Sequence, residues 1–145
     1  MSLAMSRVER EQFLAAQRVG IVSVADPGRG PLTLPIWYAY EPGGEVRFLT
    51  GAASRKAVLI RQAGRVSLCV QNETPPYQYV SVEGPVAIAE PDYERDVRPM
   101  AYRYLGVQLG DWYLQATAEE RARGTILVRL RPEHWLTADY NKMPR

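Results

Sequence analysis

The chain has 145 residues, of which 46% are hydrophobic and 23% are charged, as in an ordinary globular domain. Eighteen Lys and Arg residues against 16 Asp and Glu residues give a net charge of +2, which is too small to indicate nucleic acid or a membrane surface as a partner. A single cysteine excludes an internal disulfide and favours a reducing, cytoplasmic setting, and with one histidine it cannot form a zinc site of the usual kind.

The N-terminal segment shows no signal-peptide pattern, and the chain contains no apolar run long enough to span a membrane. Residues 1–4, which precede a second methionine, are typical of a cloning remnant, so we expect a single domain over residues 5–145. Ser6 and Glu9 have the spacing of a capping box, which predicts a short helix from Ser6 to near Gln17.

Three strands are predicted next, separated by turns rich in glycine and proline: Val19–Ala25, Pro31–Tyr40 and Glu45–Thr50. The second strand alternates in character, and one of its faces carries Leu32, Leu34, Ile36, Tyr38 and Tyr40. The opposite face, which includes Trp37, also carries bulk, so we expect both faces to be covered.

The remaining elements alternate between helices and strands. We expect a short helix from an N-cap at Ser54 to about Gln62, strands Arg65–Gln71 and Tyr79–Ala89, helices Pro91–Tyr104 and Asp111–Arg121, strand Thr125–Leu130, an extension of the sheet over 134–139, and a loose tail over 140–145. Gly84-Pro85 predicts a bulge or a barrel corner, Pro99 predicts a kink, and Gly106 can end its helix.

Strands joined by tight turns pair antiparallel, and six or more of them in one small domain favour a closed barrel with flanking helices. The sequence therefore predicts a mainly β (α+β) fold, and the absence of a βαβ pattern argues against a doubly wound parallel sheet.

An anion site is the first candidate for function. The segment Thr50-Gly51-Ala52-Ala53-Ser54-Arg55-Lys56 runs from a strand end through small residues into a helix N-terminus. A phosphate there would meet free N–H groups, hydroxyls and two cations. The alternative is a capped surface helix with two solvated bases.

The second candidate is the strand segment Leu34-Pro35-Ile36-Trp37-Tyr38. Trp37 and Tyr38 point to opposite faces of the strand, and Pro35 removes a ladder donor, so a planar cofactor could lie against this segment. The alternative is that both aromatic residues belong to the core or to a dimer interface. A nucleophilic pair of Cys69 and His134 would lack a third orienting group.

Taken together, these segments resemble the pyridoxamine 5'-phosphate oxidase-like superfamily of FMN-binding split barrels over Ser6–Asp139. Thr50-x-x-x-Ser54-Arg55-Lys56 is similar to the family's cofactor-phosphate motif, and Tyr79–Gly84 lies where the family has a Gln-Val-x-Val-x-Gly strand. Oxidase members carry an Arg and a Lys around the second strand, which this chain lacks. Pro35-x-Trp37-Tyr38 and Ala101-x-Arg103-Tyr104-Leu105-Gly106 instead resemble the actinobacterial branch that includes reductases using the deazaflavin F420.

The resemblance implies a homodimer of six-stranded antiparallel split β-barrels that binds F420 between its subunits. It implies an oxidoreductase that passes a hydride from the reduced cofactor to an unsaturated or conjugated small-molecule acceptor. The residues that would bind the cofactor are Thr50, Ser54, Arg55 and Lys56 at the phosphate, Pro35, Ile36 and Trp37 at the ring, and Tyr79 from a neighbouring strand. Arg61 and Arg65 could extend a basic groove. No metal and no catalytic acid is assigned, and solvent or a tyrosine such as Tyr104 could supply the proton.

Three alternatives stay open from the sequence. The nearest is an FMN-dependent oxidoreductase of the same fold, which would need no long basic groove. A carrier or sensor would bind the cofactor without turnover, and a dimeric barrel could bind no cofactor at all.

Overall fold

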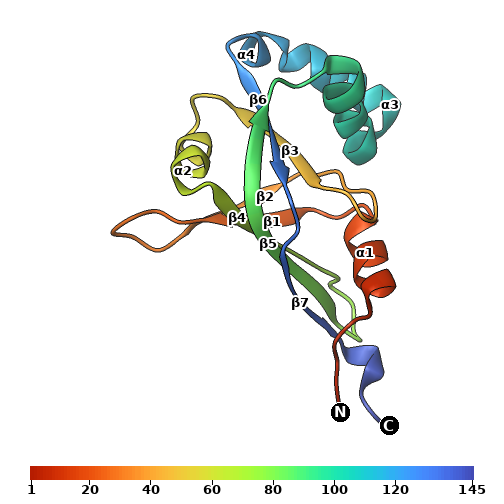
Figure 1. Cartoon of the computed structure of the whole chain (residues 1–145). Coiled ribbons are helices and arrows are strands. Elements are labelled where there is room, and N and C mark those ends of the chain that lie inside the picture. The colour runs from red at the N-terminus through yellow and green to blue at the C-terminus, as the bar shows by residue number, and fades with distance from the viewer.

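A computed structural model of residues 1–145 shows six strands that curl into a barrel and a seventh strand that extends one side of the sheet (Figure 1). The strands are β1 Gly20–Val24, β2 Leu32–Ile36, β3 Val46–Gly51, β4 Arg65–Gln71, β5 Gln78–Ala89, β6 Thr125–Leu130 and β7 His134–Asp139. They run in the order β2-β1-β4-β5-β6-β3, with every neighbouring pair antiparallel, and β7 pairs with β5. This confirms the predicted six-stranded antiparallel barrel.

The barrel closes where the chain beyond β2 meets the start of β3. Ala39 and Arg47 form an isolated antiparallel bridge, with a hydrogen bond of 2.9 Å from each backbone N–H to the other residue's carbonyl. Those two bonds join the two ends of the strand order. The edges of the sheet are therefore joined by one bridge rather than by a continuous ladder.

Strand β5 changes partner along its length. Its first half lies between β4 and β7, with Glu83 opposite His134, and its second half pairs with β6 from Val86 onward. The register with β4 runs without interruption through Gly84, so the predicted bulge is absent and the predicted corner is present. A Cβ at Gly84 would lie 1.9 Å from the carbonyl oxygen of Arg131, so the chain between β6 and β7 can approach only a glycine there.

The core fills the barrel. Ile36, Tyr38 and Tyr40 are all buried, which confirms the face predicted for this segment. Helix α1, Arg7–Ala15, begins at the predicted capping box of Ser6 and ends two residues earlier than expected. The Tyr38 hydroxyl donates a 2.6 Å hydrogen bond to the carbonyl oxygen of Leu14 in α1.

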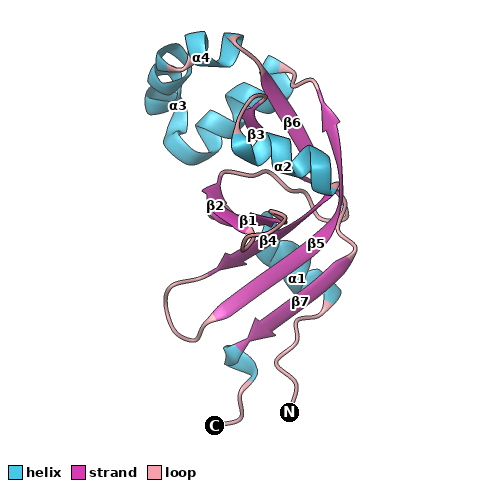
Figure 2. Ribbon diagram, turned by 90° about the vertical axis from the view of Figure 1, so that its left-hand side faces the viewer, coloured by secondary structure: helices cyan, strands magenta, loops and turns pink.

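Three more helices lie toward the β3 and β6 end of the molecule (Figure 2). Helix α2, Arg55–Ala63, is capped by Ser54 as predicted. A π-helical turn, η1 Tyr93–Val97, leads into α3 Arg98–Ala116 and α4 Ala118–Ala122. Pro99 falls in the first turn of α3, where proline needs no hydrogen-bond partner, so the kink predicted there is absent. Gly106, with φ 77° and ψ 177°, is non-helical and separates two helical stretches within α3, so it ends its helix as predicted.

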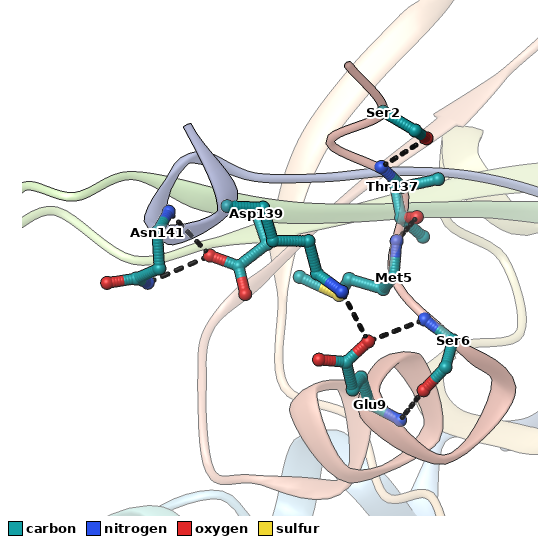
Figure 3. A network of polar contacts seen from close by, with 9 residues as sticks. Ser2, Met5, Ser6, Glu9, Thr137, Asp139 and Asn141 are labelled. Atoms are coloured by element: carbon teal, nitrogen blue, oxygen red, sulfur yellow. Dashed lines mark hydrogen bonds and ion pairs between the residues drawn. The ribbon is translucent and has the colours of Figure 1, made fainter. Parts of the chain in front are cut away.

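The two termini lie side by side, and the C-terminal residues are ordered by polar contacts (Figure 3). The predicted loose tail is wrong over its first residues, because η2 Tyr140–Lys142 is a short 3₁₀ turn capped by Asp139. Lys142 pairs with Glu9 at 2.9 Å, and that hydrogen bond is the largest of the effects that lower the pKa of Glu9 from 4.5 to about 2. None of the helices combines the length and the apolar character that a membrane span requires.

Candidate cofactor site

A cavity of about 550 Å³ lies between one end of the barrel and the helices that cover it. Segments from six parts of the chain line it: Val19 just before β1, the end of β2, the end of β3, the first turn of α2, the region from η1 to α4, and the start of β6. Its lining includes Pro35, Ile36, Trp37, Leu49, Thr50, Gly51, Lys56, Val97, Met100, Tyr113, Leu114, Thr117, Glu120, Arg121 and Thr125. The structure thus brings together the two segments that the sequence analysis singled out separately.

The β2 side of the cavity is aromatic. Trp37 stacks on Tyr104 with ring centroids 5.1 Å apart and planes 6° apart, and it lies against Tyr113 at 5.2 Å and 52°. The Tyr104 hydroxyl accepts a 3.0 Å hydrogen bond from the Tyr38 N–H and donates to the Arg18 carbonyl oxygen at 2.6 Å. These hydrogen bonds hold the segment around Trp37 in place, and Tyr104 itself is not among the residues that line the cavity.

The β3–α2 side of the cavity is polar. Thr50 is buried at the end of β3, and its hydroxyl lies 3.1 Å from that of Ser54. The Ser54 hydroxyl also accepts a 3.1 Å hydrogen bond from the N–H of Ala57. Lys56 is half-buried, lines the cavity and has no hydrogen-bond or ion-pair partner in the chain, and burial lowers its pKa.

The other predicted bases lie elsewhere. Arg55 is not among the residues that line the cavity, and it pairs with Asp26 at 2.6 Å, so it ties α2 to the turn after β1. Arg61 donates to the carbonyl oxygen of Ala52, and Arg65 pairs with two glutamates at the barrel surface. Arg65 therefore does not extend a basic groove from the cavity.

Tyr79 also lies outside the cavity of its own chain. It is on β5, opposite Gln71 of β4 and Ala138 of β7, in the half of the strand far from β6. Cys69 and His134 lie on β4 and β7 with β5 between them, so they do not form a nucleophilic pair. Burial raises the pKa of the Cys69 thiol, as expected for an inert cysteine.

Sequence reasoning missed the cavity wall supplied by α3 and α4. Tyr113, Thr117 and Arg121 follow one another at intervals of four residues, which places them on one side of the helical path, facing the cavity. That spacing was the available signal. It was obscured by the neighbouring Glu119 and Glu120, which made the segment look like a solvated face.

The cavity suits a planar cofactor with an anionic tail. Its volume falls within the range of roughly 300–1,000 Å³ typical of small-molecule sites. Trp37 offers an aromatic wall, and Lys56 offers a half-buried cation that no carboxylate of the chain neutralises. A buried cation is stable when an anion accompanies it, so a phosphate next to Lys56, Thr50 and Ser54 satisfies that requirement.

Comparison with known proteins gives a consistent result. The family model for pyridoxamine 5'-phosphate oxidase matches residues 7–139. Among solved structures, a conserved hypothetical protein from Mycobacterium tuberculosis is 26% identical, with a TM-score of 0.78 over 99% of this chain and 92% of that one. A search of the curated proteins finds no match.

Two more distant structures share the fold. A protein named F420 reductase is 20% identical, with a TM-score of 0.61 over 87% of this chain and 94% of that one. A FAD-binding protein from Mesorhizobium loti is 21% identical, with a TM-score of 0.62 over 92% of both chains.

Proposed function

The chain belongs to the pyridoxamine 5'-phosphate oxidase family, and on that premise we propose that it is an F420-dependent oxidoreductase that reduces an unsaturated or conjugated small molecule. One observation carries the proposal. A single cavity joins the half-buried, unpaired Lys56 to the aromatic strand end at Trp37, although these residues come from different elements. A cation and a flat apolar wall in one cavity are what a phosphorylated tricyclic cofactor requires.

The residues of the cavity have separate tasks in this proposal. Lys56 and the hydroxyls of Thr50 and Ser54 hold the cofactor phosphate, while Arg55 acts indirectly by fixing the first turn of α2 through Asp26. When bound, reduced F420 supplies the hydride, and solvent supplies the balancing proton.

Pro35, Ile36 and Trp37 face the ring system, with Trp37 held by its stack on Tyr104. The same aromatic wall keeps water away from the reacting atoms.

One feature supports F420 over FMN, because the β2 segment has no cation where the oxidase members have two. One structure of the same fold is named F420 reductase. The FAD-binding structure from Mesorhizobium loti supports the flavin alternative to the same degree, since its TM-score is about the same. A direct comparison of the two cofactors is therefore the first experiment.

The test is a fluorescence titration of the purified protein with F420 and, separately, with FMN. We expect micromolar or tighter binding of F420 and weaker binding of FMN. Lys56→Gln should weaken F420 binding about 10- to 100-fold, the equivalent of roughly 1.5–3 kcal/mol for a lost charge-assisted hydrogen bond. The matched control Arg55→Gln removes the neighbouring charge, and should weaken binding by less than about threefold, because that charge is already paired.

Each other outcome has a definite meaning. Preferential binding of FMN would assign the chain to the flavin-dependent enzymes of this fold. Tight F420 binding without hydride transfer to any acceptor would indicate a carrier or sensor. Binding of neither cofactor would indicate that the N-terminus of α2 is only a capped surface helix and not a phosphate site.

We also propose that the working unit is a homodimer whose subunits both contribute to each site. Tyr79 lies outside the cavity of its own chain, and Val19, which lines the cavity, is 52% exposed. A second subunit would cover Val19 and could bring its Tyr79 to the cofactor. Light scattering should give twice the mass of the chain, and a monomer that binds cofactor fully would refute this assembly.

A further inference from the structure

Arg121 is a cation in the cavity that the cofactor phosphate does not require. It lies in the last turn of α4, is half-buried and lines the cavity together with Tyr113 and Thr117. Its Nη1 donates to the hydroxyl of Thr117 at 2.8 Å, and its Nη2 donates to the carbonyl oxygen of Leu114 at 3.0 Å. The guanidinium is thus held in a fixed orientation by α3.

The partners of Arg121 fix its position without neutralising its charge. Both acceptors are uncharged, and no ion pair of the chain includes Arg121. Glu120, which lines the same cavity, is exposed and does not pair with it. A guanidinium has five N–H donors, of which two are used here, so three can still bind an anion. A fixed, uncompensated arginine is prepared for a carboxylate, whose geometry its planar fork matches.

The cavity surface around Arg121 is apolar and aromatic. Leu114 and Met100 are buried, and Trp37 and Tyr113 form a tilted aromatic pair. The phenol hydroxyl of Tyr113 makes no hydrogen bond in the chain, so its ring is positioned by packing alone. Such a wall accommodates a flat hydrocarbon body and provides a stacking surface.

We propose that the acceptor is a planar conjugated compound bearing a carboxylate, with the carboxylate held by Arg121 and the conjugated part against Tyr113, while Trp37 faces the cofactor ring. This inference rests on the proposed function, in which Lys56 serves the cofactor phosphate and leaves Arg121 for the substrate. The inference predicts that the protein binds a conjugated carboxylic acid more tightly than the corresponding neutral amide.

The test uses trans-cinnamate and cinnamamide as probes, titrated by calorimetry into the full-length protein without cofactor. The two probes share size, planarity and conjugation, and differ in charge. We expect cinnamate to bind about tenfold or more tightly than cinnamamide. Arg121→Gln should lower cinnamate affinity to that of the amide and leave amide affinity unchanged, which also shows that the cavity is intact.

Two further variants separate this site from its surroundings. Arg123→Gln removes an exposed charge two residues away that does not line the cavity, and should preserve the preference for the acid. Lys56→Gln should also preserve it. Equal binding of the two probes to the wild type, no binding of either, persistence of the preference in Arg121→Gln, or its loss in Lys56→Gln would each overturn the proposal.

The same proteins distinguish this inference from the proposed function. Arg121→Gln should bind F420 as the wild type does. If the wild type fails to bind F420 yet discriminates the acid through Arg121, the cofactor assignment fails and the carboxylate subsite stands. If F420 binds and the discrimination is absent, the subsite fails and the cofactor assignment stands.

Discussion

Replacing Tyr104 by phenylalanine removes one hydroxyl and leaves the ring that stacks on Trp37. In the structure that hydroxyl accepts the Tyr38 N–H at 3.0 Å and donates to the Arg18 carbonyl oxygen at 2.6 Å. Tyr38 is completely buried, so water cannot replace the lost acceptor for its N–H. Arg18 is only half-buried, so its carbonyl oxygen can be rehydrated at less cost.

The expected loss of folding stability follows from how deeply the Tyr38 N–H and the Arg18 carbonyl oxygen are buried. A buried N–H without a partner costs about 1–3 kcal/mol, and the partly accessible carbonyl adds a fraction of that. We therefore expect Tyr104→Phe to lower the free energy of unfolding by about 2–3 kcal/mol. For a domain of this size such a loss lowers Tm by roughly 5–10 °C.

Urea unfolding followed by circular dichroism at a fixed protein concentration measures this loss. Tyr77→Phe is the matched control, because Tyr77 is 53% exposed and its hydroxyl has no partner, so it should change stability by less than about 0.5 kcal/mol. If Tyr104→Phe unfolds within about 0.5 kcal/mol of the wild type, the hydroxyl does not anchor the Trp37 segment and the reasoning is refuted.

Two further variants test other parts of the fold. Gly84→Ala places a Cβ 1.9 Å from the backbone oxygen of Arg131, which no side-chain movement relieves, so we expect little soluble protein in expression trials; a normal yield and wild-type Tm would contradict this close approach. Glu9 has a pKa lowered to about 2 in the folded protein, so its stabilising effect is complete above its ordinary pKa of 4.5 and is lost as the pH falls from 4.5 toward 2. The wild type should therefore have a higher Tm than Glu9→Gln at neutral pH, and the difference should disappear near pH 2; a difference independent of pH would contradict the role of the ionised carboxylate in the contact with Lys142.

The pattern of apolar and polar residues along the sequence predicted those strands whose bounds depend on nearby residues alone. The bounds of β4 and β6 are those expected, because β4 has alternating burial and both strands are bounded by turns or helices. The second strand was expected to continue to Tyr40, and its ladder ends at Ile36. Beyond that point Tyr104 bonds the backbone of Tyr38 in place of a neighbouring strand. A side chain 66 positions away leaves no trace in a local pattern.

The same distinction applies to the candidate site. The sequence predicted that Arg55 and Lys56 stand together at a helix start, and it gave them equal roles. Their difference comes from tertiary structure, because Asp26 lies within reach of one and nothing charged lies within reach of the other. The role of Arg121 in the cavity wall was also invisible, since it depends on how α4 is placed relative to β3 and α2.

The single bridge between Ala39 and Arg47 gives the barrel a seam. Every other junction between barrel strands is a ladder of at least three residue pairs, whereas this one rests on two hydrogen bonds. The cavity-lining ends of β2 and β3 lie on either side of that seam. If the two backbone hydrogen bonds between Ala39 and Arg47 break, the barrel can open locally beside the cavity while every strand ladder stays intact. The amide protons of Ala39 and Arg47 should therefore exchange with solvent well before those of β4 and β5.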